Sequence, residues 1–176
     1  MKTMSGESLA FEGVVDVGIL VMAHFENPAT EEALVFLRKV LSGDIRAAIP
    51  TTTLLGAYHV MTRYLHVSPL EAGEALGDTL SMQSSAFFES VRKEAVQQAM
   101  IMAPMYNTAS WDAFYLSLAR HLGTRVLFSL DEELKRKTTD FVVVNPIREQ
   151  TMKKYNAFIA RIRKKKRNSN ERFHER

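Results

Sequence analysis

A carboxylate interrupts the apolar run Val14-Val15-Asp16-Val17-Gly18-Ile19-Leu20-Val21, which we interpret as the first strand of the fold. β-Branched residues dominate this run, as is typical of a strand that is buried on both faces. An unpaired carboxylate is unstable in such surroundings. Asp16 therefore needs a hydrogen-bond partner or a cation, and the run predicts a functional residue as well as a strand.

Strand and helix signals alternate along the rest of the chain. Short runs of β-branched and aromatic residues predict further strands at residues 46–49, 86–88, 126–130 and 141–144. Apolar periodicity and capping residues predict helices between residues 27 and 44, at 54–65, after the capping box Ser68-Pro69-Leu70-Glu71, and at 92–103, 111–122 and 149–165. This order predicts an α/β protein, a three-layer α/β/α fold with a central, mostly parallel sheet.

Two more aspartates lie where a carboxylate is costly. Asp131 ends the run Val126-Leu127-Phe128-Ser129-Leu130-Asp131, and Asp112 follows Trp111 in the first turn of a mostly apolar helix. Ligands of parallel sheets bind beyond the carboxyl ends of the strands. We therefore expect Asp16, Asp112 and Asp131 to converge at one edge of the sheet, where a Mg²⁺ or Mn²⁺ ion would keep all three ionised.

Each aspartate also has a structural interpretation. Asp112 can interact favourably with the helix dipole while Ser110 caps that helix, and Asp131 can cap the turn into residues 132–137. Asp16 fits such a role least, because a strand interior offers no helix end to cap. Its structural alternative is a buried hydrogen bond.

Composition excludes several other kinds of site. The chain contains no cysteine, which excludes a disulfide framework and a thiolate zinc site. The sequence has no H-E-x-x-H, G-x-G-x-x-G or G-x-S-x-G motif and no phosphate-binding G-K-[ST] loop. It carries no signal peptide, and no apolar run reaches the length of a membrane span. We predict a cytoplasmic protein that does not associate with membranes.

Charge is distributed unevenly along the chain. Residues 153–176 contain ten Lys or Arg and two Glu, so the preceding residues sum to −5 within the overall charge of +3. An acidic body with a basic tail favours a polyanionic partner, and a solvated end is the alternative interpretation. We predict that the partner is RNA and that it contacts the basic run Arg163-Lys164-Lys165-Lys166-Arg167.

In their order and spacing these segments resemble a PIN domain, the metal-dependent ribonuclease fold of many toxin–antitoxin toxins. Val14-Val15-Asp16 resembles the first acidic strand, residues 27–34 the first helix, and Ser110-Trp111-Asp112-Ala113 the helix that carries the third acid. Residues 127–134 resemble the last acidic strand, in which a hydroxyl two residues before the acid, here Ser129, is usual. The resemblance covers residues 13–147, between an N-terminal extension (residues 1–12) and a C-terminal amphipathic helix with a basic tail (residues 148–176).

The resemblance implies an endoribonuclease in which Asp16, Asp112 and Asp131 bind Mg²⁺ or Mn²⁺ and catalyse cleavage, supported by Ser129 and Ser110. It also implies an antitoxin protein as partner, while the oligomeric state, a homodimer included, stays open. Two positions depart from the family pattern. Gly56 aligns with the usual second acid, a Glu, and Val17 follows Asp16 where Thr or Ser is usual. These departures favour the alternative of a degenerate PIN fold that binds RNA or a protein without cleaving.

Overall fold

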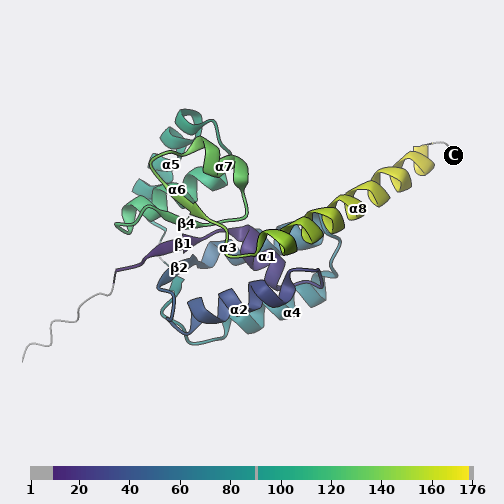
Figure 1. Ribbon diagram of the computed structural model, residues 1–176, viewed down its shortest axis with the longest axis horizontal. Helices are drawn as coiled ribbons and strands as arrows, with labels where there is room; N and C mark the ends of the chain where they lie inside the picture. The colour runs from purple at the N-terminus through teal and green to yellow at the C-terminus, as the bar shows by residue number, and fades with distance from the viewer. Residues whose placement is uncertain (1–9, 90, 175–176) are drawn as a thin grey trace, which may run out of the picture.

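The computed structural model of the protein describes residues 10–89 and 91–174, with side chains as far as residue 164. Within these residues, five strands form one sheet in the order β3-β2-β1-β4-β5, and all neighbouring strands are parallel. The strands are β1 Gly13–Val15, β2 Ala47–Pro50, β3 Phe87–Phe88, β4 Val126–Phe128 and β5 Val142–Val144. Helices cover both faces of this sheet (Figure 1), which confirms the predicted three-layer α/β/α class.

The alternation of side chains along the strands divides the core into two layers. Val15 and Ile49 point to the face that α1, α2, α3 and α4 cover, whereas Val14 and Leu127 point to the face that α5, α6 and α7 cover. Successive side chains of a strand point to opposite faces, so both faces of these strands are apolar. The helices are α1 Val17–Ala23, α2 Thr30–Leu41, α3 Thr51–Arg63, α4 Pro69–Leu80, α5 Lys93–Tyr106, α6 Ser110–His121, α7 Glu132–Lys137 and α8 Glu149–His174.

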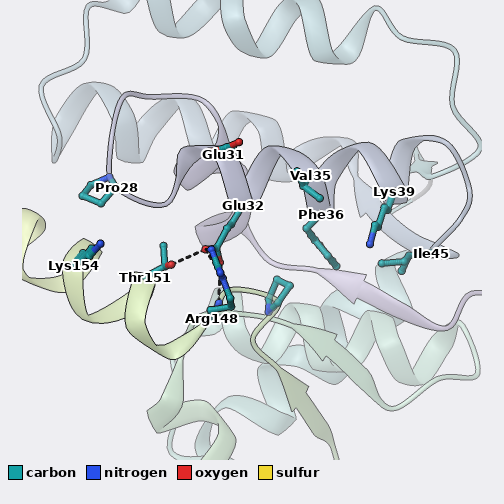
Figure 2. A pocket seen from close by; sticks show the side chains of 11 residues that line it. Pro28, Glu31, Glu32, Val35, Phe36, Lys39, Ile45, Arg148, Thr151 and Lys154 are labelled. Atoms are coloured by element: carbon teal, nitrogen blue, oxygen red, sulfur yellow. Dashed lines mark hydrogen bonds and ion pairs between the residues drawn. The ribbon is translucent and has the colours of Figure 1, made fainter.

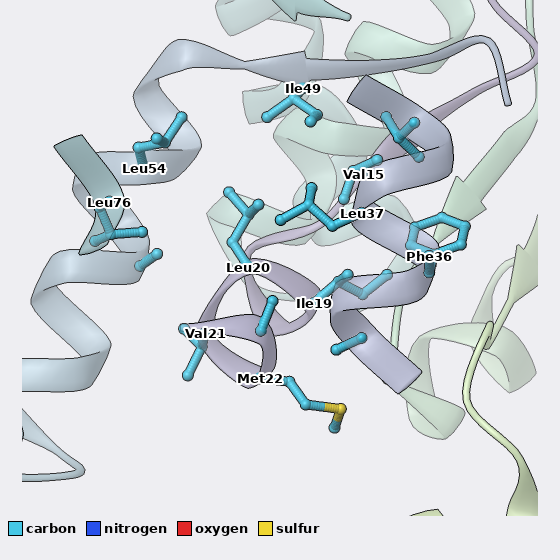
Figure 3. Packing of buried hydrophobic residues seen from close by; sticks show 14 of the residues in the cluster. Val15, Ile19, Leu20, Val21, Met22, Phe36, Leu37, Ile49, Leu54 and Leu76 are labelled. Carbon is cyan, nitrogen blue, oxygen red and sulfur yellow. The ribbon is translucent and has the colours of Figure 1, made fainter. Parts of the chain in front are cut away.

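The larger core layer is built around α1. Figure 3 shows Ile19 and Leu20 of α1 gathered with Leu37 of α2 and the sheet residue Ile49 in one cluster, and all four residues are at most 2% exposed. Burial of one such aliphatic side chain stabilises the fold by roughly 1.5–3 kcal/mol. Helix α1 is therefore held against the sheet and α2, and with it the segment that joins β1 to α1.

The first strand is shorter than the sequence predicts. The run 14–21 was expected to be one strand, but β1 ends at Val15 and α1 begins at Val17. A short apolar run does not distinguish a buried strand from a buried helix, and here tertiary burial selects the helix for its second half. Asp16 consequently occupies the N-cap position of α1 with an extended backbone, and its expected placement inside a strand is wrong.

Other predicted boundaries also differ from the structure. Helix α5 continues through Pro104 to Tyr106 and ends at Asn107, which adopts the left-handed conformation (φ 49°) that Asn tolerates at a helix end. The predicted capping box at Ser68 does not form, because Ser68 occupies the N-cap of α4 without a side-chain cap hydrogen bond. Strand β4 ends at Phe128 instead of residue 130. Helix α3 begins at Thr51, three residues before the predicted start at residue 54.

Helix α8 is fixed to the body at its first turn. Glu32 of α2 accepts hydrogen bonds from the Arg148 backbone N–H (3.0 Å) and Nε (2.8 Å) and from the Thr151 hydroxyl (2.6 Å) (Figure 2). The Arg148 guanidinium lowers the pKa of Glu32 to about 2. Farther along, Met152 and Tyr155 pack against the core, the Phe158 ring lies 6.2 Å from that of Phe25, and the last turns of α8 project away from the body (Figure 1).

Two sequence predictions concern residues at the ends of the chain. Residues 1–9 of the N-terminal extension lie outside the described residues, and the proposed division between residues 147 and 148 stays a prediction.

None of the helices in the described part of the chain combines the length and the apolar character needed to cross a bilayer.

Candidate functional site

Asp16 lies at the switch point of the sheet, where the strand order changes from one side of β1 to the other. Strands β2 and β3 extend the sheet on one side of β1, and β4 and β5 extend it on the other. Val15 pairs with Phe128, so Asp16 and Ser129 leave the carboxyl ends of two neighbouring parallel strands side by side. Ligands of open parallel sheets bind in the crevice at such a switch point. The site is therefore where the topology alone would put it.

The Asp16 carboxylate is buried and has one side-chain donor. The side chain of Ser129 donates a hydrogen bond of 2.6 Å from its hydroxyl to Oδ2 of Asp16, whose residue is only 7% exposed. Burial raises the pKa of Asp16 to about 6, although the Ser129 hydrogen bond acts in the opposite direction. The same Ser129 oxygen accepts a hydrogen bond of 3.2 Å from the Asp131 backbone N–H. Ser129 thus connects the ends of β1 and β4.

Asp112 and Asp131 both lie at helix starts. Asp112 is in the first turn of α6, where burial raises the pKa of its carboxyl and a 3.0 Å hydrogen bond from the Thr108 hydroxyl opposes this rise. Oδ1 of Asp131 accepts hydrogen bonds from the N–H groups of Glu133 (2.7 Å) and Leu134 (2.9 Å), which makes Asp131 the side-chain cap of α7. The capping role considered for Asp131 from the sequence is therefore present.

Ser110 does not act as the expected cap. It is the first residue of α6, and Ala109 occupies the N-cap position instead. The cap role considered for Ser110 is therefore wrong, and its supporting role at a metal site stays a prediction.

The three carboxylates influence one another. The negative charges of Asp112 and Asp131 each raise the pKa of Asp16, and Asp131 also raises that of Asp112. Nevertheless, among the residues that the structure describes, no three His, Cys, Asp or Glu side chains lie close enough together to hold one metal ion. Mg²⁺ is usually bound by one or two carboxylates together with waters and a phosphate, so binding of a metal ion by the three aspartates stays a prediction.

A buried tyrosine hydroxyl near Asp16 and Asp112 was not foreseen from the sequence. Within the described residues, the hydroxyl oxygens of Thr52, Thr53 and Tyr115 are buried without a hydrogen bond of good geometry. The hydroxyls of Thr53 and Tyr115 nevertheless lie close together, because Thr53 lowers the pKa of Tyr115 as a hydrogen-bonding neighbour. Burial raises the pKa of Tyr115, and the charges of Asp16 and Asp112 raise it further, so this hydroxyl lies near both carboxylates. A buried unpaired hydroxyl costs roughly 1–3 kcal/mol, and water is its usual remedy. A hydrated cation beside Asp16 would supply such a water.

The two departures from the PIN pattern are in contact with each other. A Cβ atom built on Gly56 would lie 3.3 Å from Cγ2 of Val17, the residue directly after Asp16. Position 56 on α3 therefore faces the neighbourhood of Asp16, and the valine methyl packs where a side chain at position 56 would begin. Sequence reasoning identified both positions but could not have paired them, because the contact joins two different helices.

The basic run lies at the far end of the chain. Arg163 and Lys164 are exposed on α8, whereas the side chains of Lys165, Lys166 and Arg167 lie outside the described ones. Arg163 lines a cavity that Val17 and Gly18 also line, so this part of α8 is close to the segment that follows Asp16.

The fold is shared with solved structures. The chain is similar to the crystal structure of PAE2754 from Pyrobaculum aerophilum, with a TM-score of 0.54 and 19% identity over 88% of this chain and 98% of that one. It is also similar to a toxin–antitoxin complex from Klebsiella pneumoniae, with a TM-score of 0.50 and 17% identity over 76% of this chain and 97% of that one. No protein-family model and no curated protein sequence matches the chain. At these identities the likeness concerns the fold.

Proposed function

We propose that the protein is a PIN-like endoribonuclease that requires Mg²⁺ or Mn²⁺. The observation that carries this proposal is the Asp16 carboxylate, which is buried at the switch point of the sheet near two further aspartates. A buried carboxylate with a pKa of about 6 favours binding a proton or a cation. Among the reactions open to such a site, hydrolysis of a phosphodiester uses a metal ion held by carboxylates.

The residues of the chain have distinct roles in this proposal. Asp16 and Asp112 would hold the ion, which lowers the pKa of a bound water and neutralises charge on the scissile phosphate. Ser129 orients the Asp16 carboxylate through its 2.6 Å hydrogen bond. Asp131 adds negative charge to the site while its position is fixed by the cap of α7. The hydroxyl of Tyr115, which lies near Asp16 and Asp112, would hydrogen-bond a water of the hydrated ion.

We further propose that the protein acts as a toxin that a cognate antitoxin protein inhibits. The similarity to a toxin–antitoxin complex from Klebsiella pneumoniae supports this proposal at the level of the fold. The basic run 163–167 would hold the phosphate backbone of the RNA substrate, since the rest of the chain is net acidic. A homodimer is compatible with both proposals.

A second function is favoured by one specific observation. The apolar contact between Val17 and Gly56 occupies the position where the family carries a carboxylate, so this chain holds fewer metal ligands. On that reading the protein binds RNA or a partner protein and does not cleave. The two functions differ in whether RNA is cut when a divalent ion is present.

A cleavage assay with Mn²⁺, Mg²⁺ and EDTA on single-stranded and structured RNA distinguishes them. Cleavage by the wild type in Mn²⁺ that is lost in EDTA and in Asp16→Asn supports the ribonuclease. The exposed Asp44 supplies the control, because Asp44→Asn makes the same change of charge away from the site. RNA binding without metal-dependent cleavage at any ion concentration would favour the non-cleaving module.

A further inference from the structure

A groove extends from the Asp16 segment along α8. It has a cavity volume of about 950 Å³ and lies between α1, the end of α3, and α8. Ligand pockets of proteins measure roughly 300–1,000 Å³, so the groove is large enough for more than a small ion. At its inner end, a Cβ built on Gly18 would lie 3.9 Å from Oδ2 of Asp16. We call this cavity the α8 groove; its lining includes Val17 and Gly18, the two residues that follow Asp16 in the chain.

Two tyrosines form the walls of the α8 groove. Tyr64, directly after α3, is 61% exposed, and Tyr155 of α8, in the same lining, is half-buried against the core. Burial raises the pKa of Tyr155 while the nearby Arg163 opposes this rise. Of the five α8 residues in the lining, Tyr155, Ile159 and Arg163 recur every four positions and so share one helix face. The lining therefore includes two tyrosine rings and one guanidinium.

The charge around the groove favours a polyanion. Residues 149–164 of α8 contain five Lys or Arg and one Glu, and Arg163 and Lys164 are exposed. Among the residues with described side chains, Arg163 has no acidic partner within 4.0 Å. A guanidinium without a carboxylate partner is suited to bind phosphate. An apolar protein segment would use the walls of the groove but not its charge.

We propose that the α8 groove binds single-stranded RNA and leads it to Asp16. A base stacks on the exposed ring of Tyr64, the half-buried Tyr155 lines the same cavity, and Arg163 binds a backbone phosphate. From residue 155 to residue 163, α8 rises by about 12 Å, which matches three or four stacked nucleotides at roughly 3.4 Å each. Stacking tolerates any base, so the groove binds unpaired RNA with little sequence preference. The choice of RNA as the ligand rests on the proposed function. The observations of the groove, its tyrosine rings and its charge are independent of that function.

Binding of a fluorescent single-stranded oligoribonucleotide in EDTA tests the groove apart from catalysis. Tyr64→Ala should weaken binding by roughly five- to a hundredfold, the range for loss of one base–aromatic stack. Arg163→Gln should weaken binding and reduce the slope of log K against log salt by about 0.7, the contribution of one phosphate contact. Duplex RNA should be insensitive to Tyr64→Ala, because its bases are already stacked.

Two matched variants serve as controls. Tyr58→Ala removes a tyrosine of α3 outside the groove lining, and Arg161→Gln removes an exposed arginine of α8 outside it. Equal losses in Arg163→Gln and Arg161→Gln, or unchanged affinity in Tyr64→Ala, would overturn the proposal. Absence of RNA binding by the folded wild type would also overturn it and would leave a protein segment as the occupant. The binding assay contains EDTA and no metal, so its result does not depend on whether the protein cleaves RNA. The proposed function and the proposed groove can therefore be refuted independently.

Discussion

Replacement of Asp16 by Asn provides the sharpest test of the electrostatics of the site. The variant keeps the shape of the side chain and an oxygen that can accept the Ser129 hydrogen bond, which measures 2.6 Å in the native protein. It removes a negative charge that burial and two neighbouring aspartates make unfavourable. We expect Asp16→Asn to be more stable than the wild type at neutral and alkaline pH in the absence of metal.

The magnitude follows from linkage between protonation and folding. The pKa of Asp16 rises from 3.8 to about 6 on folding. At about 1.4 kcal/mol for each pH unit between these values, the ionised form costs the folded state about 3 kcal/mol. Below pH 3.8 the carboxyl is protonated in both states and costs nothing. The stability that the neutral form provides is lost as the pH rises through about 6. The buried amide donor of Asn offsets about 1 kcal/mol, so a net gain of about 2 kcal/mol is expected at pH 8.

Urea unfolding in EDTA at several pH values measures this gain. The single tryptophan, Trp111, lies next to Asp112 and reports on the site by fluorescence. For a chain of this length, a gain of about 2 kcal/mol corresponds to a melting temperature about 4–8 °C higher. Addition of Mn²⁺ should reverse the order, because the wild type binds the ion more tightly and gains stability by mass action. Asp44→Asn controls for the change in net charge.

Two results would refute the reasoning. If Asp16→Asn were no more stable than the wild type at pH 8, the carboxylates of the site would not be strained. If the gain were the same at pH 4 and pH 8, it would come from packing and not from charge.

Three further variants separate the roles of the site residues. Ser129→Ala removes the donor to ionised Asp16 and should lower the free energy of unfolding by roughly 1–3 kcal/mol at pH 8 but by less at pH 4, as measured by urea unfolding. An equal loss at both pH values would mean that Ser129 acts through packing. Asp131→Asn should keep the cap of α7, whereas Asp131→Ala should cost about 1 kcal/mol, and titration calorimetry should show weaker Mn²⁺ binding in both. Unchanged affinity in both variants would exclude Asp131 from the site. Gly56→Glu combined with Val17→Ala, which removes the 3.3 Å contact, should bind Mn²⁺ more tightly than Val17→Ala alone. A folded double variant with no gain would mean that position 56 does not reach the ion.

The sequence by itself determined the class of the fold and the residues worth testing. The alternation of apolar runs with helical periodicity is a local signal, and it correctly predicted a parallel sheet between two layers of helices. Carboxylates in apolar surroundings are visible without a structure, because the cost of their burial depends on the residues beside them. Asp16 and Asp112 were identified in this way, and burial does raise the pKa of both.

Only the tertiary structure decided how those residues are used. The run after Asp16 is apolar enough for either a strand or a helix, and contact with α2 and α3 fixes it as α1. The cap that Asp131 makes for α7 requires the helix to begin at Glu132, which the sequence left as one of two alternatives.

The unforeseen parts of the site all depend on contacts between distant segments. In the sequence, Tyr115 resembles an ordinary core residue of an apolar helix. Only the packing of α6 beside β1 brings its hydroxyl near Asp16. The contact between Val17 and Gly56 joins α1 to α3, and the α8 groove joins residues about 140 positions apart. Periodicity and composition report on neighbours along the chain, whereas a site is made by neighbours in space, and their pairing is fixed only when the core packs.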